Sequence, residues 1–340
     1  EDAAVVARKM IAALSAPVSV EGHELSPTVS IGIALCPADG RDVDTLLKHA
    51  DTAMYGAKEA GRNGFQFFVA DMNVRAFERL MLENALRRAI EQDELSLHYQ
   101  PQIRVADGQV CGCEALVRWQ HPEMGMIMPA QFIPVAEDSG LIVALGDWVL
   151  EQACRQQALC ARAGRLLTIA VNISALQFRR ADFVDRVADI LARTGANPRL
   201  IELEITESAL MQPSDALHER LQRLGGLGLG LALDDFGTGY SSLAYLKRLP
   251  ISRLKIDRSF VRDLPGDAED VAVASATLSL ARDLGLEVVA EGVENAAQLE
   301  WLKARDCQIV QGFLFAPALP AADFLAWLQA CGAQPAGTTD

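Results

Sequence analysis

From residue 94 onward the chain alternates β-like runs with helix-like runs, and this alternation limits the fold more than any other feature. Six of the β-like runs are LLTIAVNIS, RLIELEIT, LGLALDDF, SRLKID, LEVVAE and CQIVQGF. Helices are predicted near residues 130–163, 181–194, 214–225, 241–248, 267–284, 295–305 and 321–330. Strands that alternate with helices are typical of an α/β protein with a largely parallel sheet.

Two further β-like runs precede these six, ELSLHYQPQI and GQVCGCEALVRW, and the segment VADG lies between them. An Asp-Gly pair between strands indicates a hairpin, so these two strands are expected to be antiparallel. The resulting eight strands predict a modified (β/α)8 TIM-like barrel with an antiparallel first strand. An open doubly wound sheet is the alternative, but we find no glycine-rich phosphate loop after its first strand.

The first 70 residues predict a small partial α/β segment. Two amphipathic helices flank the runs VSVEGHEL and PTVSIGIAL, which we expect to be two strands joined by a turn, and a short strand GFQFFV follows. A connecting helix is expected next. We therefore divide the chain into the C-terminal part of an α/β domain (1–70), a connecting helix (71–93) and a barrel (94–335).

Acidic or amide side chains stand at the ends of the predicted barrel strands. They are Glu114, Asn172, Glu204, Asp234, Asp235 and Glu291. A single such residue is ordinarily a rim residue or half of a salt bridge, and an Asp-Asp pair alone can be a cap and turn. Six such groups at the active-site end of a barrel are hard to explain in that way, because the five carboxylates among them would repel one another without cations. Oxygen ligands without histidine or cysteine favour hard ions, so we predict two divalent cations, Mg²⁺ or Mn²⁺.

Two cationic residues belong to the same series. Lys255 ends an apolar strand, and Asp257 lies two positions further on. Lys255 and Asp257 could form an ordinary surface ion pair, or Lys255 could position an attacking water or a phosphate oxygen. Arg118 follows Glu114 by four residues and could bind a phosphate through two hydrogen bonds, with a rim ion pair as the alternative. We keep Arg118 and Asp257, together with Gln311 further along the chain, as candidate substrate-binding residues.

The composition limits the partners of the chain. A formal net charge of −14 argues against a general DNA- or RNA-binding surface, which needs a basic stripe. Seven cysteines occur without zinc spacing, and no apolar run is long enough to span a membrane, so we expect a cytoplasmic domain with reduced thiols. No catalytic histidine or serine is assigned. Because the chain starts without Met, we expect a fragment whose membrane association comes only from regions upstream.

Seven motifs in a fixed order resemble the EAL domain family of cyclic di-GMP phosphodiesterases. They are EALVRW, VNIS, ELEITES, DDFGTGYSSL, LKIDRSF, AEGVE and QGFLF, and the resemblance covers roughly residues 78–331. The runs VSIGIALCP and DTAMYGAKEAGRNGFQFF resemble the C-terminal part of a GGDEF (diguanylate cyclase) domain. The GGDEF signature itself is absent, so we do not expect this segment to synthesise cyclic di-GMP.

The resemblance implies an activity and a set of cation ligands. Members of the family hydrolyse cyclic di-GMP to linear 5′-pGpG, often as dimers, so we expect a homodimer through the barrel. The first cation would be held by Glu114, Asn172, Glu204 and Asp234. Asp234 and Asp235 would hold the second cation. Glu291 matches a glutamate of the family that acts as general base or holds metal-bound water.

The resemblance also implies roles for residues around the cations. Lys255 matches the lysine that contacts the attacking water, and Glu207 matches the glutamate that fixes the loop from Phe236 to Ser242. Gln311 matches a glutamine near the metals, and Arg118 matches the arginine on the substrate phosphate. No position departs from the family pattern, which favours an active enzyme. A non-catalytic cyclic di-GMP sensor and a metal hydrolase for another substrate are the alternatives.

Overall fold

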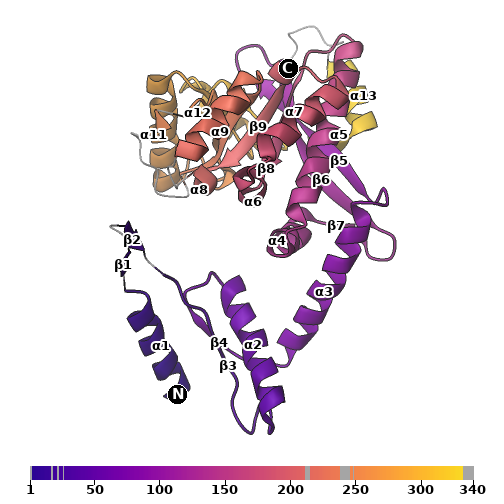
Figure 1. Cartoon of the computed structure of the whole chain (residues 1–340). Coiled ribbons are helices and arrows are strands. Elements are labelled where there is room, and N and C mark those ends of the chain that lie inside the picture. The colour runs from indigo at the N-terminus through magenta and orange to yellow at the C-terminus, as the bar shows by residue number, and fades with distance from the viewer. Residues whose placement is uncertain are drawn as a thin grey trace. The chain divides into compact units, whose positions relative to one another are not determined.

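The chain forms two compact units, Glu1–Ala85 and Leu86–Asp340, which are described separately (Figure 1). The structure is a computed structural model that describes residues 2–16, 18–20, 23–25, 27–210, 215–237, 246–247 and 249–331. Helix α3 (Asp71–Ala89) contains the boundary between the units. Among the described residues, no helix is both long and apolar enough to cross a lipid bilayer.

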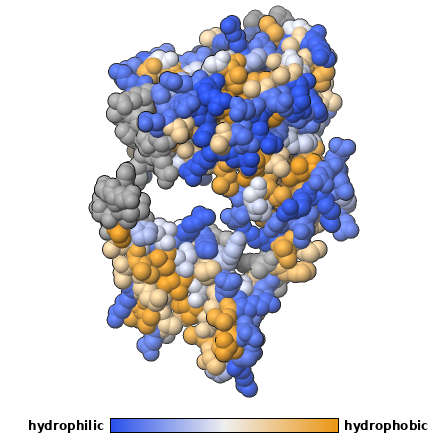
Figure 2. All heavy atoms as spheres, in the orientation of Figure 1, coloured by the Kyte–Doolittle hydropathy of each residue, from blue (hydrophilic) through white to orange (hydrophobic). Residues whose placement is uncertain are grey.

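The N-terminal unit contains two small sheets. Its elements are α1 (Asp2–Leu14), β1 (Val18–Val20), β2 (His23–Leu25), β3 (Ile31–Ile33), α2 (Val43–Glu59) and β4 (Phe65–Phe67). The expected hairpin between VSVEGHEL and PTVSIGIAL is wrong, because β1 and β2 pair with each other and both lie inside the first run. Strand β3 pairs in parallel with β4, and α2 is the crossover that a parallel pair requires. Apolar side chains are exposed over α1 and α2 (Figure 2).

The second unit is a closed barrel of eight strands. In chain order these are β5 (Leu95–Arg104), β6 (Val110–His121), β8 (Thr168–Ile173), β9 (Ile201–Thr206), β10 (Gly230–Phe236), β11 (Arg253–Ile256), β12 (Glu287–Ala290) and β13 (Ile309–Val310). Strand β5 is antiparallel to both β6 and β13 and thereby closes the ring. The short strands β7 (Gly125–Ile127) and β14 (Leu319–Pro320) extend the sheet. The predicted barrel with an antiparallel first strand is confirmed.

Helices cover the outside of the ring (Figure 1). The described ones are α4 (Pro129–Ser139), α5 (Ile142–Arg162), α6 (Ala175–Arg179), α7 (Phe183–Thr194), α8 (Glu207–Leu210), α9 (Asp215–Gly226), α11 (Ala268–Leu284), α12 (Ala296–Lys303) and α13 (Ala321–Cys331). Two 3-10 turns, η1 (Pro198–Leu200) and η2 (Arg258–Phe260), precede β9 and follow β11. Strand β9 is buried along nearly its whole length, as expected for a parallel strand covered on both faces.

Three sequence expectations need correction or lie outside the described part. The single helix expected over 130–163 is two helices, because Gly140 adopts a left-handed φ of 77° and ends α4. Glu114 lies in the middle of β6 and not at its end, because β6 continues past the barrel to pair with β7. The expected helix over 241–248 lies almost entirely outside the described residues.

The turn after β13 leaves no room for a side chain at Gly312. A Cβ atom there would lie 2.1 Å from the backbone oxygen of Val293 and 2.3 Å from its backbone nitrogen. We predict that Gly312→Ala lowers the free energy of unfolding by about 1–3 kcal/mol, because the backbone must move. Gly225→Ala, in helix α9 with nothing within 4 Å of the new Cβ, should instead add about 0.5–1 kcal/mol. Chemical denaturation measures both, and equal effects would contradict the prediction.

Candidate active site

A buried ammonium group lies at the centre of the predicted carboxylates. The Lys255 side chain is 1% exposed. Its Nζ lies 2.6 Å from Glu291 Oε1, 2.8 Å from Glu204 Oε2, 3.2 Å from Asp234 Oδ1 and 3.7 Å from Glu114 Oε1. Lys255 is therefore not half of a surface ion pair. It compensates charge inside the barrel.

The barrel strands bring these groups together from distant parts of the chain. Asn172 on β8 and Glu204 on β9 are direct neighbours in register, so their side chains share one face of the sheet. Asn172 Nδ2 donates to Glu114 Oε1 at 2.6 Å, which links β8 to β6. Glu291 directly follows β12, and Gln311 directly follows β13. The residues predicted from the strand ends thus converge at one end of the barrel.

Adjacent strand residues normally point to opposite faces, and the backbone at Asp234 and Asp235 avoids this. The pairing of β10 with β11 shifts register between Leu233 and Phe236. Asp235 adopts φ of 55°, a left-handed conformation that aspartate tolerates better than most residues. The backbone N–H of Asp235 donates to Asp234 Oδ1 at 3.0 Å. Because of this local irregularity, the two consecutive aspartate side chains need not point to opposite faces of the sheet.

Burial and mutual repulsion shift the pKa values of the cluster. Burial raises the pKa of Glu204 well above its ordinary value. Burial also raises the pKa of Glu291, to about 7, against the opposing charge of Lys255. Glu114 differs, because Lys255 and the amides of Gln311 and Asn172 outweigh the effect of burial and hold its pKa below the ordinary value. Four acidic groups thus face one ammonium, and ionising all four of them requires more positive charge than Lys255 supplies.

The donor chemistry of this cluster fits divalent cations. All predicted ligands offer oxygen atoms, which hard ions prefer. The Glu204 side chain is 0% exposed, and its Oε1 accepts no hydrogen bond from any described donor. A buried carboxylate oxygen without a donor is costly unless a cation compensates it. Within the described residues, no three His, Cys, Asp or Glu side chains are grouped as a ready ligand set, and the Lys255 ammonium lies among the carboxylates.

Glu207 connects the site to the segment after β10. It is the first residue of α8 and is 2% exposed. The backbone N–H of Gly237 donates to Glu207 Oε2 at 3.1 Å. Only Phe236 and Gly237 of the predicted loop are described, so its remaining residues to Ser242 lie outside the described part.

Of the three candidate substrate-binding residues, Gln311 contacts Glu114 directly, and Arg118 and Asp257 lie beside the cluster. Arg118 is on β6, four residues beyond Glu114, and alternation places both on one face of the strand. Its guanidinium donates to the Val117 carbonyl, and burial lowers the pKa of Arg118. Asp257 accepts the backbone N–H of Ser259 at 2.9 Å and thereby caps η2. The structure assigns Asp257 this capping contact, and its contact with substrate remains a prediction.

Sequence reasoning missed two glutamines on the antiparallel strand. Gln100 and Gln102 face the barrel interior from β5, and both contact Gln311. Polar residues at alternating positions in HYQPQIR were the available signal, because one face of a strand has a period of two.

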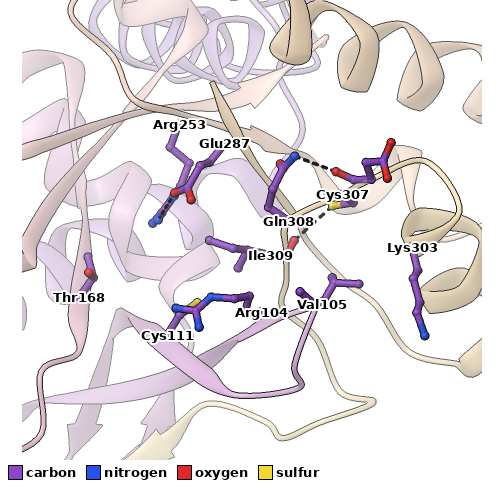
Figure 3. A pocket seen from close by; sticks show the side chains of 12 residues that line it. Arg104, Val105, Cys111, Thr168, Arg253, Glu287, Lys303, Cys307, Gln308 and Ile309 are labelled. Atoms are coloured by element: carbon purple, nitrogen blue, oxygen red, sulfur yellow. Dashed lines mark hydrogen bonds and ion pairs between the residues drawn. The ribbon is translucent and has the colours of Figure 1, made fainter. Parts of the chain in front are cut away.

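A separate cavity of about 520 Å³ lies at the opposite end of the barrel, where the parallel strands begin (Figure 3). Arg253, at the start of β11, donates to Glu202 at 2.8 Å and to Glu287 at 2.9 Å. Arg104 and Cys111 line the facing wall. Charges here are paired, in contrast to the excess of carboxylates at the other end.

The fold and the site define a β/α-barrel protein with a cluster of buried carboxylates around a lysine at one end of the barrel. Residues 83–318 match the family model described as EAL domain, and residues 1–64 match the model described as Diguanylate cyclase, GGDEF domain. The chain belongs to the EAL domain family and carries a GGDEF fragment in front of it.

Two similar proteins and one solved structure support the assignment to this family. The chain is 49% identical over 326 residues to "Bifunctional diguanylate cyclase/cyclic di-GMP phosphodiesterase MucR" of Pseudomonas aeruginosa, covering 96% of this chain and 48% of that protein. It is 44% identical over 330 residues to "Cyclic di-GMP phosphodiesterase NbdA" of the same species, covering 97% and 42%. The chain therefore spans less than half the length of these relatives. A solved structure, "PaMucR Phosphodiesterase, c-di-GMP complex", is 49% identical with a TM-score of 0.70, covering 72% of this chain and 99% of that one.

The central ammonium yields a prediction that is independent of turnover. Lys255→Met leaves four carboxylates without their buried counter-charge, so we expect unfolding to become easier by about 3–5 kcal/mol in the presence of a chelator. Added Mn²⁺ should restore more stability to this variant than to the parent. Thermal unfolding with chelator and with Mn²⁺ measures both effects. Lys303→Met, at a side chain that is 59% exposed, is the matched control and should change little. A Lys255→Met variant as stable as the parent in chelator would contradict this account.

Proposed function

We propose that the chain is a divalent-cation-dependent phosphodiesterase that hydrolyses cyclic di-GMP to linear 5′-pGpG. The observation that carries the proposal is the convergence of four carboxylates and one asparagine around the buried Lys255 ammonium. The similarity to two cyclic di-GMP phosphodiesterases and to a solved c-di-GMP complex supports cyclic di-GMP as the substrate. The sequence carries an oxygen ligand at every position that the family pattern requires, which favours an enzyme over a sensor.

The ligand residues divide into two proposed sets. Glu114, Asn172, Glu204 and Asp234 would hold one cation, Asp234 and Asp235 would hold the second, and Glu291 completes the set. When bound, two Mg²⁺ or Mn²⁺ ions supply the positive charge that makes a water molecule more acidic and stabilises charge on the phosphate. The excess of buried carboxylates supports this assignment, since their repulsion falls when the cations bind.

The proposed proton acceptor is Glu291. Its raised pKa of about 7 suits a general base near neutral pH. Lys255 Nζ lies 2.6 Å from Glu291 Oε1, so the ammonium can stabilise that carboxylate directly, and its remaining N–H donors could orient the attacking water. Attack in line with the leaving 3′ oxygen then cleaves one phosphodiester bond, and Arg118 binds the phosphate oxygens.

Turnover of cyclic di-GMP, followed by chromatography with Mg²⁺, with Mn²⁺ and with a chelator, tests the function. Metal-dependent formation of 5′-pGpG is expected. Tight binding of cyclic di-GMP without product in either metal would identify a sensor instead. Sedimentation of the same protein tests the expected homodimer, which remains a prediction.

Glu114→Ala should abolish metal binding and hydrolysis together. It removes a cation ligand and leaves the donors of Asn172 and Gln311 without their acceptor. We expect turnover to fall on the order of 100-fold or more. Glu287→Ala, at the opposite end of the barrel, is the matched control and should keep the parent rate. Turnover by Glu114→Ala at the parent rate would refute its role as a ligand.

Glu207→Ala should weaken cation binding without removing a ligand. The Gly237 N–H loses its acceptor, and the segment after the two aspartates loses its anchor. We expect metal affinity to fall by about 10–100-fold, measured by Mn²⁺ titration. Glu207→Gln keeps an oxygen acceptor and should retain much of the affinity. Parent-like Mn²⁺ binding in Glu207→Ala would count against this role.

A further inference from the structure

Two buried amides, Gln102 and Gln311, lead from strand β5 to the Glu114 carboxylate, and the part-buried amide of Gln100 joins them at Gln311. Gln102 is 0% exposed, and its Nε2 donates to Gln311 Oε1 at 3.1 Å. Gln311 Nε2 donates to Glu114 Oε2 at 2.6 Å and to Gln100 Oε1 at 3.0 Å. Gln100 Nε2 in turn donates to the carbonyl of Ala316 at 3.2 Å. Gln311 thus has its two N–H donors and its oxygen engaged.

These hydrogen bonds can run in one direction only. An ionised carboxylate accepts and cannot donate, so Gln311 must direct its nitrogen toward Glu114. The Gln311 side-chain oxygen then faces Gln102, so Gln102 must donate a hydrogen bond to it from its own side-chain nitrogen. Without Gln102, the Gln311 oxygen loses its donor, and only Glu114 and Gln100, which both accept from Gln311 Nε2, still orient this amide. The Gln311 side chain can then rotate or shift, and the Glu114 carboxylate loses a donor held at a fixed position.

Burying the Gln102 amide lowers the stability of the folded chain, and side-chain packing alone does not explain why a polar residue lies there. Its Oε1 is buried and accepts no hydrogen bond from the described residues. An unsatisfied buried polar group costs about 1–3 kcal/mol, and an apolar side chain of similar length would avoid that cost. The barrel also leaves space for this amide, because a Cβ at Gly112 would lie 3.0 Å from Gln102 Oε1 and 2.8 Å from the Thr168 carbonyl.

We propose that Gln102 is a positioning residue for the cation site. By holding the Gln311 amide in one orientation, it fixes the Glu114 carboxylate in the place from which it binds a divalent cation. The role rests on the proposed function, since it assumes that Glu114 is a cation ligand. Gln102 itself touches neither cation nor substrate.

The test is Gln102→Met, which keeps the length of the side chain and removes both polar atoms. We expect the dissociation constant for Mn²⁺, measured by electron paramagnetic resonance without substrate, to rise about 10-fold. With cyclic di-GMP at saturating Mn²⁺, kcat should fall while KM stays within about twofold. The melting temperature should stay equal to that of the parent or rise, because the unsatisfied oxygen is gone. Gln102→Leu is the second variant if methionine prevents folding.

Two controls separate positioning from packing. Gln157→Met makes the same change at another fully buried glutamine, which lies on the outer helix α5 and accepts the backbone N–H of Asn197 through its Oε1. This variant should leave the Mn²⁺ affinity unchanged. In a Gln311→Ala background, Gln102→Met should have no further effect on Mn²⁺ affinity, because its partner is gone.

Mn²⁺ affinity equal to that of the parent in both Gln102 variants would overturn the proposal. It would also be overturned if Gln102→Met lowered Mn²⁺ affinity as much in the Gln311→Ala background as in the parent. The metal measurement needs no turnover, so the two proposals can fail separately. A parent that binds Mn²⁺ but forms no 5′-pGpG refutes the proposed function alone. A parent that hydrolyses cyclic di-GMP while the Gln102 variants bind Mn²⁺ normally refutes the positioning role alone.

Discussion

The structure depends on the Lys255 ammonium being held among carboxylates in the barrel interior. Removing a charge from water costs several kcal/mol, and the cost is offset only when counter-charges lie close. Four strands or strand ends supply these counter-charges, with Nζ–oxygen distances between 2.6 and 3.7 Å. Their convergence requires a closed ring, which β5 completes by pairing with both β6 and β13. The site can therefore assemble only when the barrel closes.

Much of this arrangement could be predicted from the sequence, because its signals are local and repeated. Strand–helix alternation predicted the barrel, and Asp107-Gly108 correctly predicted the antiparallel first pair. A polar residue at the end of an otherwise apolar strand has few structural explanations, so Glu204, Asp234 and Glu291 could be grouped before any contact was known. Their meeting at Lys255 follows from strand order alone, since parallel strands end at the same rim.

Other features depend on three-dimensional context that no local pattern encodes. The left-handed φ of Asp235 follows from a register shift against β11, a partner about 20 residues further along the chain. The break at Gly140 competes with a helical pattern that continues on both sides of it. The contact between Gln102 and Gln311 joins residues 209 positions apart. In each case the deciding interaction is between segments, and a single segment does not contain it.

The two ends of the barrel show why charge balance identifies the site better than cavity volume. At the end where the parallel strands begin, Arg253 satisfies Glu202 and Glu287 together, and the cavity of about 520 Å³ lies beside paired charges. At the other end, one ammonium faces four carboxylates, and a fully buried Glu204 oxygen has no donor among the described residues. Unbalanced buried charge destabilises the folded chain unless a ligand of opposite charge binds. The end with the imbalance is therefore the end where we propose that cations bind, and the amide chain from Gln102 reaches Glu114 at that end.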